Sequence, residues 1–173
     1  AVTDENGIFT FTNVPYGEYL IKEIKPADGY LDNEDVFTVT IKDNEQVVEL
    51  TAINDKVPEL KTTATVNGKK EVIAKGEITI KDTVEYKHLV PNTEYVIKGT
   101  LMDKSTGKPF KVKGKEITST VKFVPDKADG KVEVTFTFDG SAIKKDTELV
   151  VFETLSRDNV EIAVHADLKD KGQ

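Results

Sequence analysis

The chain has 173 residues, enough for one large domain or two small ones but too few for a large multidomain enzyme. Its 38% hydrophobic and 32% charged residues suit a packed core and exclude wholesale disorder. The net charge of −7 argues against binding to nucleic acid or to an anionic membrane, since both need a positive protein face. Arg157 is the only arginine among the 24 basic residues, which leaves little scope for bidentate phosphate binding.

The residue inventory also excludes several kinds of site. Without cysteine the chain has no disulfide, no thiolate metal site and no cysteine nucleophile. Two histidines cannot by themselves build a zinc site, so we expect neither a metal nor a cofactor. No apolar run reaches the roughly 18 residues of a membrane span, and no signal peptide opens the sequence. We therefore expect no membrane insertion in this segment, with any export signal or anchor encoded outside it.

Composition and periodicity both favour an all-β fold. The 20 threonines and 21 valines are β-branched residues that suit pleated strands. Apolar and polar residues alternate, with Gly, Asn, Asp and Pro at the boundaries, as half-buried strands do. The expected strands are 8–13, 17–25, 36–41, 46–54, 60–66, 77–86, 94–102, 116–123, 131–138, 148–155 and 161–165. A single helical turn is expected at 141–145.

The strands divide into two modules. A short charged stretch with a proline, 55–59, reads as a linker, which predicts modules at 1–56 and 57–173. Seven strands at the spacing found in the second module suggest an immunoglobulin-like sandwich. The first module is too short for a closed sandwich, so we expect two tandem Ig-like β-sandwich modules of which the first is incomplete. Its missing strands would lie upstream or come from another chain by strand addition.

Three polar residues share the parity of apolar neighbours on their strands. Thr62 alternates in step with Leu60 and Ala64, and Asp82 with Ile80 and Val84, so both point inward. Glu153 lies in a segment that is apolar on both faces and is buried in either orientation. An inward threonine is most often a strand residue bonded to backbone, but Asp and Glu are almost never fully buried unless paired.

Burial of an unpaired carboxylate usually raises its pKa until the group is neutral. Two such acids, an inward hydroxyl and a nearby imidazole would make a reactive group. His165 is the candidate imidazole, although the alternation of its strand leaves its direction open. Similar parity in the first module implies a buried acid at Glu23 and a buried amide at Asn54.

At these residues the second module resembles the intramolecular ester-bond (VaFE-type) Ig-like domains of Gram-positive surface adhesins. The matching stretches are Leu60-Lys-Thr-Thr, Ile80-Lys-Asp-Thr-Val-Glu-Tyr, Gly99-Thr-Leu-Met-Asp-Lys-Ser-Thr-Gly, Val150-Val-Phe-Glu and His165-Ala-Asp-Leu-Lys-Asp-Lys-Gly-Gln. The resemblance implies an ester between Thr62 and Gln173, formed with loss of ammonia and assisted by His165, Asp82 and Glu153. In this interpretation His165 acts as the base, Glu153 orients the imidazole and a neutral Asp82 stabilises the oxyanion.

The first module is similar to the later part of a CnaB or SpaA-type prealbumin-like domain. The similarity lies in Gly7-Ile-Phe-Thr-Phe, Val14-Pro-Tyr-Gly-Glu-Tyr and Lys22-Glu-Ile-Lys-Pro-Ala-Asp-Gly-Tyr. Such domains join a first-strand lysine to a late asparagine with the help of a buried acid. Glu23 and Asn54 match the acid and the asparagine, but the strand that would carry the lysine is not in this chain. We expect no Lys–Asn bond unless a lysine is supplied from outside.

The resemblance implies a structural role as a stalk segment of a cell-wall-anchored surface adhesin, with neighbouring repeats of the same polypeptide as partners. Two alternatives stay open. A ligand-binding adhesin module would need exposed aromatics on loops, for which Tyr30 and Phe110 are the only hints. A hydrolase would use Thr62 or Ser156 with His165 and an acid, but no G-x-S-x-G motif is present. The sequence identifies no host ligand, and the loop acids Asp103, Asp126 and Asp129 lack EF-hand spacing for calcium.

Overall fold

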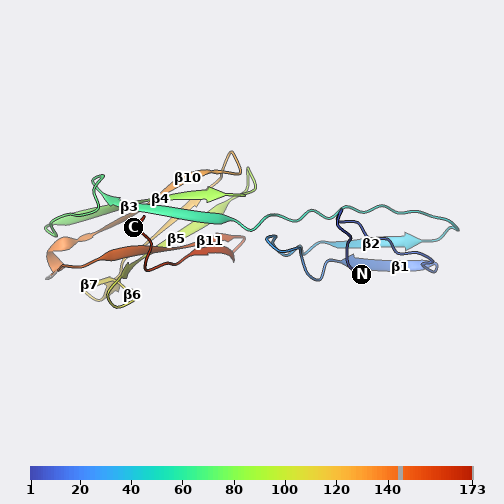
Figure 1. Cartoon of the computed structure of the whole chain (residues 1–173), viewed down its shortest axis with the longest axis horizontal. Helices are drawn as coiled ribbons and strands as arrows, with labels where there is room; N and C mark the ends of the chain where they lie inside the picture. The colour runs from blue at the N-terminus through green and yellow to red at the C-terminus, as the bar shows by residue number, and fades with distance from the viewer. Residues whose placement is uncertain (144–145, 173) are drawn as a thin grey trace. The chain divides into compact units, whose positions relative to one another are not determined.

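The computed structural model describes residues 1–143 and 146–172, and the chain forms two compact units, Ala1–Asn54 and Asp55–Gln173 (Figure 1). The division falls after Asn54, close to the predicted boundary after Lys56. All regular structure in the described residues is β-strand apart from one short 3₁₀ turn, which confirms the all-β prediction. Residues 1–143 and 146–172 contain no helix with the length and hydropathy of a membrane span.

The first unit is built around one antiparallel pair, β1 (Gly17–Lys22) and β2 (Val36–Ile41). Tyr19 lies opposite Val39 and Ile21 opposite Phe37, so β-branched and aromatic side chains pair across one face. The strands predicted at 8–13 and 46–54 do not form, and that prediction was wrong. The alternation is present in both segments, but a strand also needs a neighbour for its N–H and C=O groups, and the described part of this unit supplies none.

The second unit contains two facing sheets, visible on one side of Figure 1. One sheet has the order β10-β4-β3, with β3 (Glu59–Val66) at its edge, β4 (Glu77–Lys87) in the centre and β10 (Gly130–Asp139) beyond it. The other runs β12-β11-β5-β6 through β12 (Val160–His165), β11 (Leu149–Arg157), β5 (Tyr95–Asp103) and β6 (Lys108–Pro109), and β9 (Thr118–Phe123) also pairs with β5. All seven strands predicted for this module form.

Smaller elements complete the second unit. A hairpin of β7 (Lys111–Val112) and β8 (Lys115–Glu116) was not predicted. The 3₁₀ turn η1 (Gly140–Ala142) covers the start of the predicted helical turn, whereas Lys144 and Lys145 lie outside the described residues. Asp139 caps η1, because its side chain accepts a hydrogen bond from the backbone N–H of Ser141.

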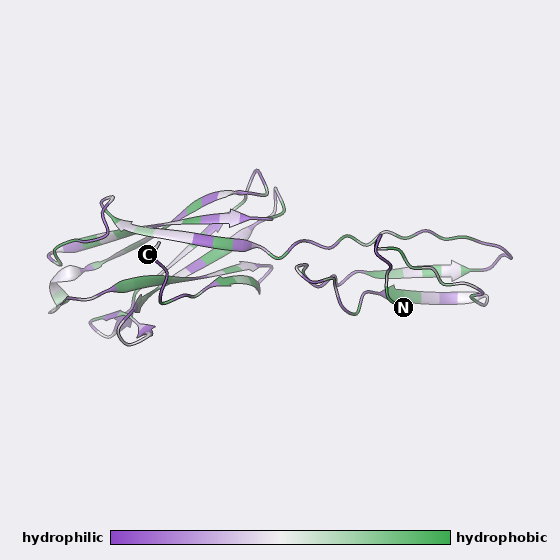
Figure 2. Cartoon of the chain, in the orientation of Figure 1, coloured by the Kyte–Doolittle hydropathy of each residue, from purple (hydrophilic) through white to green (hydrophobic). Residues whose placement is uncertain are grey.

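The core lies between the two sheets and follows directly from alternation. On β4 every second residue is buried, and in Figure 2 apolar and polar residues alternate along the strands of this unit. Val84, Ile97, Leu101, Val134 and Leu155 are each inaccessible to solvent. Polar residues occur on the same inward faces, so the core is not purely apolar.

A β-bulge decides the direction of β12. Leu155 pairs with Ala163 but Ser156 pairs with Glu161, which leaves Ile162 as an extra residue. Because one inserted residue reverses parity, Ile162 and Ala163 both pack against the core, and His165 falls opposite Glu153. The alternation of β12 alone had left the direction of His165 open.

Gly99 is required by the close approach of the two sheets. A Cβ at this position would lie 2.5 Å from Cζ of Phe136 and 3.2 Å from Cγ1 of Val134. We expect Gly99→Ala to lower the free energy of unfolding by about 1–3 kcal/mol, because the extra methyl overpacks the core. Urea denaturation followed by circular dichroism measures the change.

Lys98→Ala is the matched control, since Lys98 is the preceding residue on β5 and is exposed. It should change stability by no more than about 0.5 kcal/mol. Equal stabilities of the two variants would contradict the predicted steric role of Gly99.

Candidate functional site

The polar residues predicted to point inward are completely buried. Thr62, Asp82 and Glu153 each have 0% solvent exposure, and they are the buried polar residues of the described chain. Asp82 on β4 lies opposite Ala64 on β3, and Thr62 is two residues from Ala64 on the same face. Thr62 and Asp82 are therefore diagonal neighbours on the inner surface of one sheet, and Glu153 projects from β11 of the other.

The two acids meet across the interior of the sandwich. Burial raises the pKa of Glu153 to about 11, and the neighbouring Asp82 carboxyl adds to the rise through a hydrogen bond and through charge repulsion. No lysine, arginine or histidine among residues 1–143 and 146–172 forms an ion pair that would hold Glu153 as an anion. Glu153 is therefore protonated at neutral pH and can donate a hydrogen bond.

His165 lies directly opposite Glu153 in the β11–β12 ladder, so the imidazole and the buried acid share one face of the sheet. The imidazole is half-buried, and its Nε2 lies 2.7 Å from Oδ2 of Asp170. The expected role of Glu153 in orienting the imidazole stays a prediction. The hydrogen-bond partner that the structure gives to Nε2 is Asp170, a residue that the sequence analysis missed.

The tail after β12 returns to β3, where it covers part of the sheet edge (Figure 1). The backbone N–H of Ala64 donates to the carbonyl of Gly172 over 3.2 Å. Lys70 Nζ donates to that same carbonyl and, over 2.8 Å, to the carbonyl of Ala64. A Cβ at position 172 would lie 2.5 Å from the carbonyl oxygen of Thr62, so only glycine allows this approach.

The structure therefore places four of the predicted residues on the facing surfaces of the two sheets: Thr62, Asp82, Glu153 and His165. The fifth, Gln173, lies outside the described residues, but Gly172 before it is in contact with β3. Lys70 and Asp170 were missed. Asp170 is a carboxylate between His165 and Gln173, and that spacing was the available signal; Lys70 sits on the β3–β4 connection and carries no such signal.

The predicted pair in the first unit is also in contact. The amide Nδ2 of Asn54 donates to Oε2 of Glu23 over 2.6 Å and to the carbonyl of Leu31 over 3.3 Å. Both side chains are half-buried. The pair is thus a preformed acid–amide contact in a unit with one two-stranded sheet.

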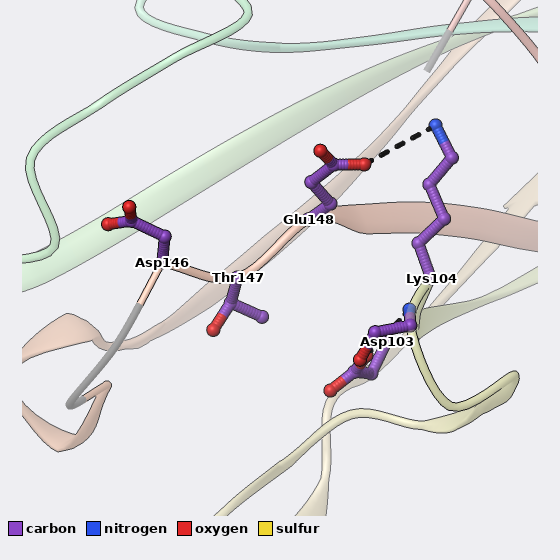
Figure 3. A pocket seen from close by; sticks show the side chains of 6 residues that line it. Asp103, Lys104, Asp146, Thr147 and Glu148 are labelled. Atoms are coloured by element: carbon purple, nitrogen blue, oxygen red, sulfur yellow. Dashed lines mark hydrogen bonds and ion pairs between the residues drawn. The ribbon is translucent and has the colours of Figure 1, made fainter.

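A polar cavity lies at the C-terminal end of β5, between the turn 103–105 and the segment 146–148 (Figure 3). Its volume is about 360 Å³, and the Lys104–Glu148 ion pair of 3.7 Å spans it. Asp103 Oδ1 accepts hydrogen bonds from the N–H and hydroxyl of Ser105, as in an ordinary turn. Among residues 1–143 and 146–172 the structure contains no cluster of three or more histidines and acids that could hold a metal ion.

Comparison with protein families assigns most of the chain to one family. Residues 58–173 match the family model described as a T-Q ester bond containing domain. The chain belongs to this family. Residues 1–56 match the SpaA model, a prealbumin-like fold domain. No curated protein matches the chain.

Solved structures similar to the chain support the fold of the T-Q ester bond domain. A bacterial adhesin from Mobiluncus mulieris containing intramolecular disulfide, isopeptide and ester bond cross-links is 21% identical, with a TM-score of 0.58 over 68% of this chain and 56% of that one. A second crystal form of this adhesin gives 20% identity and the same TM-score. The major pilin subunit of Bacillus cereus is 14% identical over 94% of this chain, and its TM-score of 0.43 is too low to support an argument. The chain spans 56% of the length of each of these proteins.

Protonation of Glu153 predicts a specific dependence of stability on pH. The folded state holds this proton up to pH about 11, whereas the unfolded chain releases it near 4.5. Stability contributed by the proton is thus complete below the unfolded pKa and is lost as the pH rises through this window. In the parent, the urea midpoint should fall as the pH rises from about 5 to about 9. We expect this fall to be smaller in Glu153→Gln, because glutamine has no proton to lose.

The comparison uses chains that also carry Thr62→Ala, so that the expected crosslink cannot form. Glu161→Gln is the control, because Glu161 is an exposed acid on the adjacent strand and its replacement leaves the buried proton in place. Parallel pH curves for the parent and Glu153→Gln would show that Glu153 is not held protonated.

Proposed function

We propose that residues 57–173 form an intramolecular ester between Thr62 and Gln173, within the stalk of a cell-wall-anchored surface adhesin of a Gram-positive bacterium. The observation that carries the proposal is the contact of Gly172 with β3 at Thr62, whose side chain is inaccessible to water. Gln173 follows Gly172 directly in the sequence, and its carboxamide is the acyl donor of the proposal. A dry hydroxyl, two buried acids and an imidazole are the groups that this condensation requires.

The reaction is an acyl transfer. Thr62 Oγ attacks the carboxamide carbon of Gln173, and His165 accepts the hydroxyl proton. The C–N bond then breaks, His165 returns the proton to the leaving nitrogen, and one ammonia departs. The O–C bond that forms makes the ester. No oxidant, metal or cofactor enters the balance.

The buried acids serve the transition state. Protonated Glu153 and its neighbour Asp82 present a hydrogen-bond donor in a water-excluded site, where stabilisation of a developing oxyanion is strong. Holding hydroxyl and carboxamide in contact can lower the barrier by about 7–11 kcal/mol. Since both reactants belong to one chain, the reaction ends after one turnover, and the domain is not an enzyme.

The ester suits a load-bearing segment. It would close a loop of about 110 residues, and the loss of unfolded-state entropy is worth roughly 4–5 kcal/mol by analogy with a disulfide. Thr62 lies on the first strand of its domain and Gln173 follows the last. Force that enters at one end and leaves at the other would pass through the covalent bond. The similarity in fold to a cross-linked adhesin and the family membership support this role.

Intact-mass spectrometry tests the crosslink. We expect the folded protein to weigh one ammonia less than its sequence, because condensation expels that molecule. Thr62→Ala should restore the full mass by removing the nucleophile. Thr63→Ala is the matched control, since the neighbouring Thr63 is exposed, and it should keep the mass loss. An unshifted mass in folded parent protein would refute the ester.

The first unit supports a second, smaller proposal. We infer that it accepts a strand from another part of the adhesin or from another chain. A lysine on that strand would form an isopeptide bond with Asn54, assisted by Glu23. Exposed apolar side chains in this unit support the proposal, because a donated strand would cover apolar surface. These residues are Val2, Ile8, Phe11, Leu20, Ile24, Val47 and Ile53.

The mass of the isolated chain tests the idea that the lysine is absent. We expect the loss of one ammonia rather than two, because the Asn54 amide bonds Glu23 and the carbonyl of Leu31, and no lysine of residues 1–143 and 146–172 is bonded to it. Asn54→Ala should leave that single loss unchanged once the residue replacement is taken into account. A loss of two, reduced to one by Asn54→Ala, would mean that the chain supplies its own lysine.

The hydrolase alternative has a direct test. An added p-nitrophenyl ester should not be turned over by the purified protein, since a crosslinked Thr62 has no free hydroxyl. Sustained release of nitrophenol that disappears in His165→Ala would favour the hydrolase instead. The role as a ligand-binding module gains nothing from Tyr30 and Phe110, because Phe110 packs against Phe138 and Tyr30 occupies a β-bridge position after the turn at Asp28 and Gly29.

A further inference from the structure

The turn that follows β3 is formed by Asn67 and Gly68. Their φ angles are +50° and +74°, so both residues are left-handed, as in a two-residue type I′ turn. Val66 and Lys69 close the turn with two backbone hydrogen bonds, of 2.8 and 2.9 Å. Asn67 and Gly68 are exposed, and a Cβ built on Gly68 would meet no atom within 4 Å. The space around this dipeptide is therefore open to water.

The turn leaves its own reactive groups free. In the described part of the chain, no hydrogen bond engages the Asn67 carboxamide or the Gly68 N–H. Glycine presents the least crowded backbone nitrogen, because it has no Cβ. Two lysines, Lys69 and Lys70, follow in the sequence, and positive charge nearby favours loss of a proton from the amide. A nucleophile and an electrophile thus lie in adjacent residues, where an intramolecular reaction is fast.

We propose that Asn67–Gly68 is a site of spontaneous modification, at which the Gly68 nitrogen attacks the Asn67 side chain and converts this asparagine to aspartate and isoaspartate. The first step forms a bond from the Gly68 nitrogen to Cγ of Asn67 and breaks the Cγ–Nδ2 bond. One ammonia leaves and takes up the proton of the Gly68 N–H. Water then opens the resulting cyclic imide at either of its two carbonyl carbons. No oxidant, metal or cofactor enters the balance.

The same dipeptide occurs at Asn6–Gly7, where the structure holds it differently. The N–H of Gly7 donates to the carbonyl of Asp4 over 3.0 Å, so the corresponding nucleophile is occupied. Asp4 N–H donates to the carbonyl of Ile8, and Oδ1 of Asp4 accepts from the N–H groups of Asn6 and Ile8. Ring closure needs rotation of the asparagine backbone, and here four hydrogen bonds resist it rather than two. The structure therefore selects Asn67 over Asn6.

A second asparagine separates the effect of the turn from the effect of the next residue. Asn159 is exposed and has a φ of +65°, which is close to the conformation of Asn67. The residue after it is Val160, whose β-branched side chain crowds the backbone nitrogen. We therefore expect Asn159 to stay intact while Asn67 reacts.

Peptide mapping tests the site, with folded Thr62→Ala protein incubated in mildly alkaline buffer. This background is needed because the imide and the expected ester each lack one ammonia. Trypsin places Asn67 in peptide 62–69 and Asn6 in peptide 1–22, and the products gain the mass of water in place of ammonia. We expect Asn67 to convert about two- to tenfold faster than Asn6, the factor that one backbone hydrogen bond is worth. Enzymatic methyl transfer to isoaspartate should label peptide 62–69.

Unfolding in urea provides the control for structure. The two Asn-Gly sites should then convert at similar rates, because the hydrogen bonds that distinguish them are gone. In the folded chain, a rate at Asn6 equal to or above that at Asn67 would overturn the proposal. So would an Asn67 that reacts in urea but is stable in the folded protein.

Asn67→Gly removes the electrophile and keeps the turn, since Gly-Gly also suits a type I′ turn. We expect no mass gain in peptide 62–69 of this variant. Asn159→Gly is the matched control, because it makes the same replacement at another left-handed turn residue, and peptide 62–69 should convert as in the parent. A mass gain that persists in Asn67→Gly would show that another residue is modified.

The modified turn lies next to the lysine that holds the C-terminal tail. Lys70 Nζ donates to the carbonyls of Ala64 and Gly172. Isoaspartate carries the chain through its side-chain carbon, which adds one atom to the backbone between Val66 and Lys69 and disturbs the pairing that closes the turn. We therefore expect the contacts of Lys70 to weaken in molecules that contain isoaspartate.

Hydrogen exchange at the amide of Ala64 measures this effect, because that N–H donates to the carbonyl of Gly172. Thr62→Ala chains carry no crosslink, so the result does not depend on the proposed ester. We expect faster exchange in the isoaspartate form than in a Thr62→Ala chain that also carries Asn67→Asp, which has the same charge on a normal backbone. Equal exchange in the two chains would show that the modification leaves the tail attached and would overturn this part of the proposal.

Discussion

The second unit depends on two carboxyl groups that face each other in a dry interior. Neither Asp82 nor Glu153 is reached by solvent, and ionising both would place like charges together without water. The structure tolerates the pair because Glu153 keeps its proton, as its raised pKa indicates. A domain that needed only stability would fill this space with apolar side chains, so the retained acids point to chemistry.

The same region solves a structural problem of the sandwich. β3 is the edge strand of its three-stranded sheet, and an open edge exposes unpaired N–H and C=O groups. The tail covers part of this edge through Ala64 and Gly172. Gly172 also lies beside the backbone carbonyl of Thr62, so covering the edge and attaching the tail to β3 are one event.

The two units differ in how much of their apolar surface is buried. In the second unit, the facing sheets bury aromatic and aliphatic side chains between them. In the first unit a single strand pair leaves most large apolar residues exposed, and Val39 is its one buried hydrophobic residue. This contrast is the physical basis for expecting a strand donor there, since a pair of strands alone is marginally stable in water.

The sequence by itself determined the all-β fold, the seven main strands of the second unit, and the inward orientation of Thr62 and Asp82. These features follow from period-two alternation, which is a local pattern and can be recognised without knowing which strands pair. Glu153 was also found, because its strand is apolar on both faces. Parity also selected Glu23 and Asn54, which the structure shows in contact although both are half-buried rather than buried.

Only the tertiary structure decided the rest. Strands at 8–13 and 46–54 needed neighbours that the first unit does not provide, so alternation alone predicted them wrongly. The bulge at Ile162 reversed the parity of β12 and turned His165 toward Glu153. Asp170 and Lys70 acquired their partners when the tail returned to β3. Contacts of this kind join residues distant in the chain, and they depend on how strands are paired rather than on the pattern within any one of them.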